Sequence, residues 1–170
     1  MAFPPDTLFR LVYVSRIAPA SEDELDSVLA EILARGQPQN RKLGVTSLLM
    51  AHRGWFIQLI EGPEAAVHEA LQAIQEDSRH RLLRVMIEGE VEKRLFPDWS
   101  LAARLLSAAD AAVLRGFDAA DWFDPTALPE RTLMRLAAVV AKAHGRRFDA
   151  QQRVTIRRRT RSAITVQCRP

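Results

Sequence analysis

The chain has 170 residues, of which 48% are hydrophobic, and a net charge of +3, as expected for one globular domain with an appendage. No apolar run approaches the roughly 20 residues that span a bilayer, and the N-terminus lacks a signal-peptide pattern. The only cysteine, Cys168, excludes an intrachain disulfide and a Cys-based zinc site, and the four histidines show no metal-ligand spacing. We therefore expect a cytoplasmic protein without a metal or a membrane segment.

The charge is distributed unevenly along the chain. From residue 146 onward eight arginines face one aspartate, whereas the preceding residues hold 16 basic and 20 acidic side chains. A basic tail can bind nucleic acid, an acidic partner or a membrane surface, but more often it is flexible and keeps a protein soluble. We expect residues 146–170 to be a flexible tail, and nucleic acid remains open as a partner.

The first predicted elements are a strand and a helix. Phe9 to Ser15 alternates with apolar groups on both faces, which predicts a central strand. Ser21 begins a capping box for a helix that Gly36 ends in a C′ position, and residues 37–42 form a polar loop. The later elements predicted for this domain are a strand over 43–51, a turn over 52–54, a strand over 54–62, a helix opened by Pro63, a turn over 77–80, and strands over 82–91 and 99–105.

This order, β-α-β-β-α-β-β, predicts an α+β fold, because its first six elements follow the split βαβ pattern of the ferredoxin-like fold. Right-handed crossovers put both helices on one face of the sheet and leave a groove between them. Residues 13, 58 and 39–40 can all approach this groove. Gln58 interrupts an otherwise apolar strand, and a buried amide needs a specific partner.

Two further helices follow the sheet. Ser107 and Asp110 cap the first, which ends at Gly116, and a linker over 118–128 leads to the second, which Pro129 opens and Gly145 ends. We expect both to cover the open face of the sheet. The predicted organisation is therefore a sheet domain over 8–105, a helical extension over 106–145 and the tail.

Five short motifs occur in order along the sheet domain. They are Tyr13-x-Ser15, Asn40 four residues before Gly44-Val45-Thr46, Gly54-x-Phe56-x-Gln58-x-x-Glu61-Gly62, Asp77-x-Arg79-His80, and Phe96-x-x-Trp99. In this order and spacing they resemble the BLUF family, the flavin-based sensors of blue light. The resemblance covers roughly residues 8 to 105.

The resemblance implies FAD held between the two helices, with its ring over the sheet. Tyr13 is then the electron and proton donor to the photoexcited flavin, Gln58 bridges the Tyr13 hydroxyl and the flavin N5/O4 edge, and Trp99 is the switch tryptophan. The implied cofactor-binding residues are Tyr13, Gln58, Ser15, Gln39, Asn40, Phe56, Arg79 and His80, with Asn40 at the flavin carbonyl edge and Arg79 and His80 near the ribityl-phosphate portion.

The resemblance also implies the mode of signalling. Light rearranges the Gln58 amide and shifts the flavin absorption to the red, and no substrate is turned over, so we expect no enzyme. The output then travels through the fifth strand to the terminal helices, toward a protein partner or a homo-oligomer interface.

Two positions and the length of one segment depart from the family pattern. Ser47 stands where a glycine is usual after the threonine, and Leu101 stands where a methionine usually follows the tryptophan by two. The segment between Tyr13 and Asn40 is a few residues longer than usual, around Ala18 to Ala20.

Two alternatives stay open at this point. The first is a light-independent acyl- or phosphate-hydrolysing protein on the same fold, which would need an anion-binding loop with an arginine and an asparagine. Arg16 lies near the end of the first strand, but no glycine-rich phosphate loop is present. The second is a nucleic-acid-associated regulator that binds through the arginine-rich tail, which is compatible with a photoreceptor.

Overall fold

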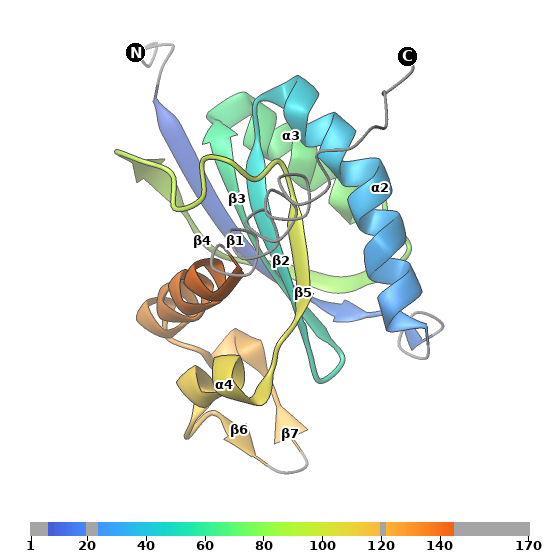
Figure 1. Ribbon diagram of the computed structural model, residues 1–170, viewed down its shortest axis with the longest axis vertical. Coiled ribbons are helices and arrows are strands. Elements are labelled where there is room, and N and C mark those ends of the chain that lie inside the picture. Colours follow the sequence, from blue (N-terminus) through green and yellow to red (C-terminus); the bar gives the residue numbers. More distant parts are fainter. Residues whose placement is uncertain (1–6, 20–23, 120–121, 145–170) are drawn as a thin grey trace, which may run out of the picture.

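The computed structural model describes residues 7–19, 24–119 and 122–144. Its main body is a five-stranded sheet in the order β4-β1-β3-β2-β5 (Figure 1). The elements of this body are β1 (Leu8–Ile17), α2 (Leu25–Leu43), β2 (Thr46–His52), β3 (Trp55–Pro63), α3 (Glu64–Gln75), β4 (His80–Val91) and β5 (Ala102–Leu105). The predicted order of strands and helices in a ferredoxin-like α+β fold is confirmed.

The two central strands, β1 and β3, pair antiparallel along almost their whole length. β4 pairs antiparallel with β1, β2 pairs antiparallel with β3, and β5 joins β2 in parallel at one edge. Tyr13, Leu11 and Phe56 lie beneath the two helices, whereas Val12 and Val14 lie on the opposite face, and all five are buried. Apolar groups therefore occupy both faces of β1, as the alternation predicts.

The first helix is longer than predicted, because α2 continues through Gly36 and Pro38 to Leu43 and includes the predicted polar loop. A Cβ on Gly36 would lie 2.5 Å from Leu101 Cδ2, so this glycine allows a close approach rather than ending the helix. The left-handed C-cap is Gly44, with φ of 68°. The predicted capping residue Ser21 lies outside the described residues.

Other boundaries differ by a few residues. β2 begins at Thr46 rather than at residue 43, β4 begins at His80 rather than at residue 82, and β5 begins at Ala102 rather than at residue 99. The predicted turn between β2 and β3 is confirmed. Its central residues Arg53 and Gly54 both have positive φ, 46° and 76°, as the common two-residue hairpin turn requires.

The chain after β5 covers the open face of the sheet. The capping box of Ser107 and Asp110 is confirmed, but the helix it opens, α4 (Ala108–Ala111), is a single turn followed by a 3₁₀ turn, η1 (Ala112–Leu114), and does not reach Gly116. The predicted linker contains a small hairpin of β6 (Asp118–Ala119) and β7 (Trp122–Phe123) and a 3₁₀ turn, η2 (Pro125–Ala127).

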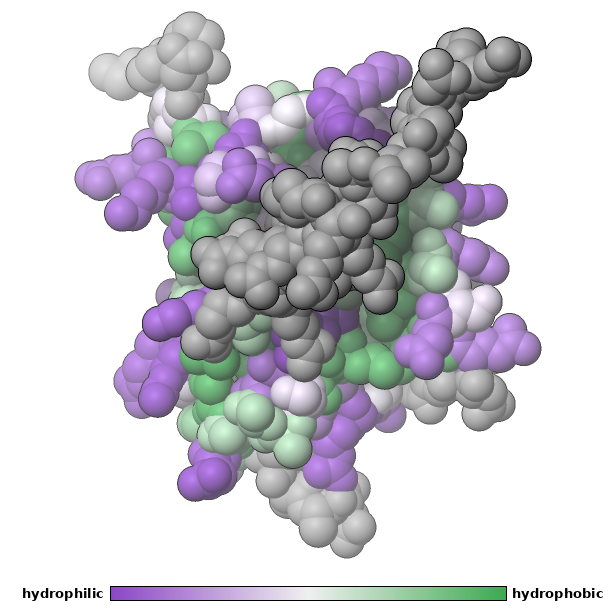
Figure 2. Space-filling model, viewed as in Figure 1, coloured by the Kyte–Doolittle hydropathy of each residue, from purple (hydrophilic) through white to green (hydrophobic). Residues whose placement is uncertain are grey.

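The last described helix spans 130–144. Its buried stripe is the predicted one, Leu133, Leu136, Ala137 and Val140, and it packs with residues of β1, β2 and β3 on the face opposite α2 and α3. Its predicted end at Gly145 and the tail lie outside the described residues. In the view of Figure 2, hydrophilic residues project at the edges while hydrophobic residues lie further in. Within the described ranges no helix is both long enough and apolar enough to cross a membrane.

Candidate functional site

A cavity of about 560 Å³ lies between α2 and α3, where the predicted groove was expected. Gln58 and Ile60 of β3 line it from the sheet, and the turn between α3 and β4 closes one side. Its other lining residues are Ile32, Arg35, Gly36, Gln39 and Asn40 of α2, Ala70, Ala73 and Ile74 of α3, Glu76, Asp77, Ser78 and Arg79 of the turn, His80 at the start of β4, and Leu101. The site therefore combines an apolar interior with amides and charged groups from distant parts of the chain.

Tyr13 and Gln58 occupy facing positions on β1 and β3. The Tyr13 hydroxyl donates to Gln58 Oε1 at 2.5 Å, and both residues are buried. Burial raises the pKa of Tyr13 well above 10, and the negative charge of Asp77 adds to this effect. The phenol therefore stays protonated and donates its hydrogen bond to Gln58, whose amide reaches the cavity from β3.

His80 lies between the cavity and buried residues of β1 and β3. Its Nδ1 shares a hydrogen bond of 2.9 Å with Ser15 Oγ. The centroid of its ring lies 4.7 Å from that of the Phe56 ring and 6.0 Å from that of the Tyr13 ring. Burial lowers the pKa of His80 to about 4; the charge of Asp77 opposes this shift and that of Arg79 adds to it. The imidazole is therefore neutral near pH 7.

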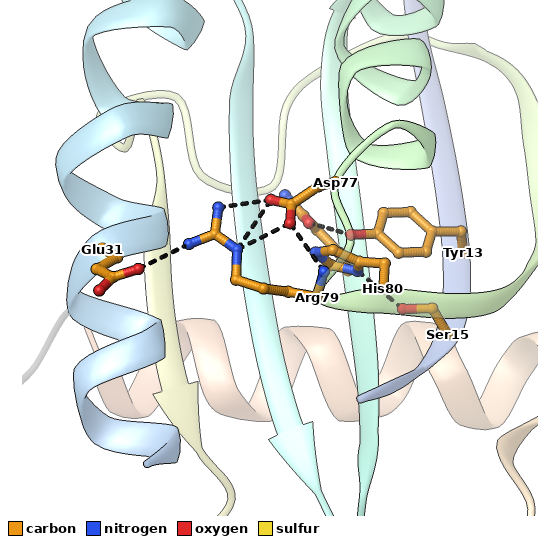
Figure 3. Close-up of polar contacts among 7 residues, drawn as sticks. Tyr13, Ser15, Glu31, Asp77, Arg79 and His80 are labelled. Carbon is orange, nitrogen blue, oxygen red and sulfur yellow. Dashed lines mark hydrogen bonds and ion pairs between the residues drawn. The ribbon is translucent and has the colours of Figure 1, made fainter. Parts of the chain in front are cut away.

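Asp77 and Arg79 form a charged pair at the side of the cavity (Figure 3). Arg79 Nε donates to Asp77 Oδ1 at 2.8 Å, its Nη2 donates to Oδ2 at 2.5 Å, and its Nη1 meets Glu31 of α2 at 3.4 Å. Burial acts to raise the pKa of Asp77, but hydrogen bonds and charge from Arg79 outweigh it and hold that pKa below its usual value. Through its contact with Glu31, Arg79 links the turn to α2.

Asn40 lies in the last turn of α2, where its side chain is held by two acceptors. Its Nδ2 donates to Ser47 Oγ at 2.9 Å and to the Ser100 carbonyl at 2.6 Å. Gln39, beside it, is exposed and also lines the cavity. The predicted pair of amides is therefore present, although on a helix rather than on a loop.

Trp99 does not line this cavity. It stacks on Phe96 with ring centroids 5.6 Å apart and meets the His144 ring edge-on at 4.7 Å. Together they border a second cavity, of about 670 Å³, between the segment before β5 and the helix over 130–144. Leu101 lines both cavities.

The structure thus brings Gln39, Asn40, Gln58, Arg79 and His80 to one cavity. Tyr13, Ser15 and Phe56 lie directly behind Gln58 and His80, and Trp99 lies apart from them. Arg35 also lines the cavity and is absent from the predicted site residues. Arg35 lies one turn before Gln39 and therefore on the same face of α2. This spacing indicates a shared site only if the helix continues past Gly36, which the sequence did not predict.

Fold and site together define a small ligand-binding domain with a buried phenol–amide pair at the base of its cavity. The model of the family described as "BLUF: Sensors of blue-light using FAD" matches residues 8–102. The chain belongs to the BLUF family, whose members sense blue light with a flavin.

Curated relatives match the same region. The chain is 31% identical over 94 residues to photoactivated adenylate cyclase subunit beta of Euglena gracilis. This match covers 55% of the present chain and 11% of the cyclase subunit. It is 30% identical over 97 residues to the alpha subunit of the same organism, covering 56% of this chain and 9% of the subunit. The chain thus spans about a tenth of the length of these relatives.

Solved structures agree on the fold. The dark-state structure of the BLUF protein BlrB is similar with a TM-score of 0.62 and 28% identity, and the match covers 81% of this chain and 99% of that one. The ground state of BlsA matches with a TM-score of 0.70 and 21% identity over 79% of this chain and 87% of that chain, a likeness of fold alone.

Proposed function

We propose that this chain is a blue-light photoreceptor that binds FAD in the cavity between α2 and α3. The observation that carries the proposal is the hydrogen bond from Tyr13 to Gln58 Oε1 at the base of this cavity. Gln58, Asn40, Gln39, His80 and Arg79 are the residues that would hold the cofactor.

The cavity fits a flavin ring in size and in chemistry. Its volume of about 560 Å³ lies within the usual range for small-molecule sites, roughly 300–1,000 Å³. Ile60, Ile74 and Ile32 supply apolar contacts for a flat aromatic ring, and amides supply both donors and acceptors without burying a charge. The charged residues Asp77 and Arg79 lie in the turn, where a polar ribityl-phosphate chain is better accommodated than a ring.

Tyr13 and Gln58 perform the light-dependent step in this proposal. A bound flavin supplies the absorption of blue light and, once excited, the capacity to take up an electron. Tyr13 would give an electron to that flavin while its hydroxyl proton passes to Gln58 Oε1, which already accepts it in a hydrogen bond, and both would return to Tyr13 once Gln58 has rearranged. Gln58 then settles in a different hydrogen-bonded arrangement, since an amide can exchange donor and acceptor positions.

The signal leaves the cavity through Leu101 and the segment before β5 in this proposal. Leu101 contacts the flavin cavity on one side and the cavity bordered by Trp99 and His144 on the other. A displaced Leu101 changes the packing of Trp99 against the helix over 130–144. That helix passes the change to a partner protein or a second copy of the chain, in the cytoplasm and without catalysis.

The hydrolase alternative is not supported by the position of its expected anion ligand. The Arg16 guanidinium lies 5.0 Å from the centroid of the Trp55 ring, and Trp55 belongs to the core on the far face of the sheet. The nucleic-acid alternative depends on the tail, which lies outside the described residues.

The proposal is tested by purifying the full chain and identifying any bound flavin by mass spectrometry after mild denaturation. We expect FAD in a ratio near one per chain and an absorption spectrum that shifts to the red under blue light and recovers in the dark. A chain that holds no flavin after reconstitution, or whose spectrum is indifferent to light, would overturn the proposal.

A further inference from the structure

Ser47 is a fully buried residue behind the Asn40 side chain, in a position where the family pattern usually has a glycine. It lies on β2 opposite Ile60 of β3, so its side chain points to the helix-covered face. It does not line the cavity itself. Its Oγ is instead bonded to the side chain of Asn40, which does.

The orientation of the Asn40 amide follows from its two partners. The Ser100 carbonyl can only accept, so the atom 2.6 Å from it must be the nitrogen Nδ2. The second hydrogen of Nδ2 goes to Ser47 Oγ at 2.9 Å. An amide nitrogen carries two hydrogens, and both are therefore donated to the protein.

We propose that Ser47 is a positioning residue that fixes the Asn40 amide so that only its carbonyl oxygen, Oδ1, is available to a ligand in the cavity. This inference rests on the proposed flavin site and deepens it. The oxidised flavin ring has one N–H donor, at N3, between two carbonyls. With both donors of Asn40 engaged, its partner on the ring is the N3–H rather than a ring carbonyl, which replaces the contact expected from the resemblance.

The same arrangement ties the cavity to the segment before β5. Asn40 holds the Ser100 carbonyl, and the backbone N–H of Ser47 donates to the Trp99 carbonyl at 3.3 Å. A glycine at position 47 would keep the backbone bond and lose the hydroxyl. The freed hydrogen of Asn40 would then be able to meet a ring carbonyl, so the residue at position 47 selects which group of the ring Asn40 recognises.

The first test compares riboflavin with 3-methylriboflavin, in which the N3 donor is replaced by a methyl group. Kd is measured for both flavins by fluorescence titration of flavin-free full-length protein. We expect the wild-type chain to prefer riboflavin by roughly fivefold or more, the effect of one neutral hydrogen bond. In Ser47→Ala and Ser47→Gly this preference should fall below about twofold, and Ser47→Thr, which keeps the hydroxyl, should retain it.

The matched control is Ser100→Ala. It makes the same chemical change beside Asn40 but removes only the acceptor of a weak bond from Arg41, of 3.3 Å, and leaves the Ser100 carbonyl in place. We expect it to retain the wild-type preference. A full preference for riboflavin in both Ser47→Ala and Ser47→Gly would overturn the inference, because a purely steric rejection of the methyl group would not depend on Ser47.

A second readout needs no flavin. In the flavin-free chain, the side-chain amide hydrogens of Asn40 are followed by NMR, and their exchange with water should accelerate by roughly fivefold or more in Ser47→Ala and stay unchanged in Ser100→Ala. Unchanged exchange in Ser47→Ala would contradict the bond between the two residues. If the wild-type chain bound neither flavin, the proposed function would fail while this measurement still decided the role of Ser47.

Discussion

Leu101 packs into the notch that Gly36 leaves in α2. A Cβ at position 36 would meet Leu101 Cδ2 at 2.5 Å, well inside van der Waals contact. This contact explains why a glycine lies in the middle of a 19-residue helix, and it places Leu101 where two cavities meet. Gly36 therefore allows α2 to pack closely against the residue that precedes β5.

A stability cycle tests this relationship. In a helix interior, replacing glycine with alanine usually stabilises a protein by about 1 kcal/mol. Here we expect Gly36→Ala to give no stabilisation, because Leu101 must move, and to stabilise by about 1 kcal/mol in a Leu101→Ala background, where the clash is absent. Urea denaturation of the four proteins measures both values. Equal effects of Gly36→Ala in the two backgrounds would show that the contact is not significant.

The local signals around Gly36 predict the wrong helix end for the same reason. Gly36 and Pro38 are ordinary helix-ending residues, and only the distant Leu101 and the true cap at Gly44 show that the helix continues. The strands are predicted more accurately, because the alternation of apolar residues and the Arg53–Gly54 turn depend only on neighbouring residues. The wrong helix end also hid Arg35.

The candidate site was predictable in part. The motif around Gln58 and the position of Tyr13 indicated a phenol–amide pair, and the facing register of β1 and β3 brings them together. Trp99 packs on Phe96 and His144 and does not line the cavity, and a helix more than thirty residues later covers that face. Sequence spacing within the sheet domain carries no information about that contact.

Replacing Tyr13 with phenylalanine removes only the hydroxyl. We expect a stability change of about 1 kcal/mol, since one hydrogen bond is lost, and retained flavin binding. The reversible light-induced red shift should disappear, because no side chain then donates to Gln58 Oε1 from this position. The measurement is a pair of absorption spectra, before and after illumination, on variant protein matched for flavin content. An undiminished shift would remove Tyr13 from the light-dependent step.

The buried His80 should make stability depend on pH. Its pKa falls from 6.5 to about 4 on folding, mainly by burial, so the unfolded chain takes up a proton first as the pH drops. The free energy of unfolding should therefore decrease from pH 6.5 down to about 4, by up to about 3 kcal/mol, and this loss should stop below pH 4.

His80→Asn is the comparison for this effect. Other groups titrate in the same range, so the quantity to measure is the difference between wild type and variant in urea denaturation at pH 7 and pH 4.5. The loss of stability on acidification should be smaller in the variant, because asparagine does not titrate. An equal loss in both proteins would mean that His80 is not the responsible group.

The two carboxylates that meet Arg79 should not be equivalent. Asp77 is bonded through both oxygens and is partly buried, whereas Glu31 is 67% exposed and meets Arg79 at 3.4 Å. We expect Asp77→Asn to cost about 1–3 kcal/mol and Glu31→Gln less than about 0.5 kcal/mol. Denaturation at low and at high salt distinguishes them, and a comparable cost for both would show that the bridge to α2 matters as much as the pair in the turn.

The central claim is that light changes the hydrogen bonding of Gln58 beside a bound flavin. The most direct measurement is the light-minus-dark absorption difference of the wild-type chain and of Gln58→Leu, each loaded with FAD. The account predicts a red shift that decays in the dark for wild type and none for the variant. A full red shift in Gln58→Leu would contradict it.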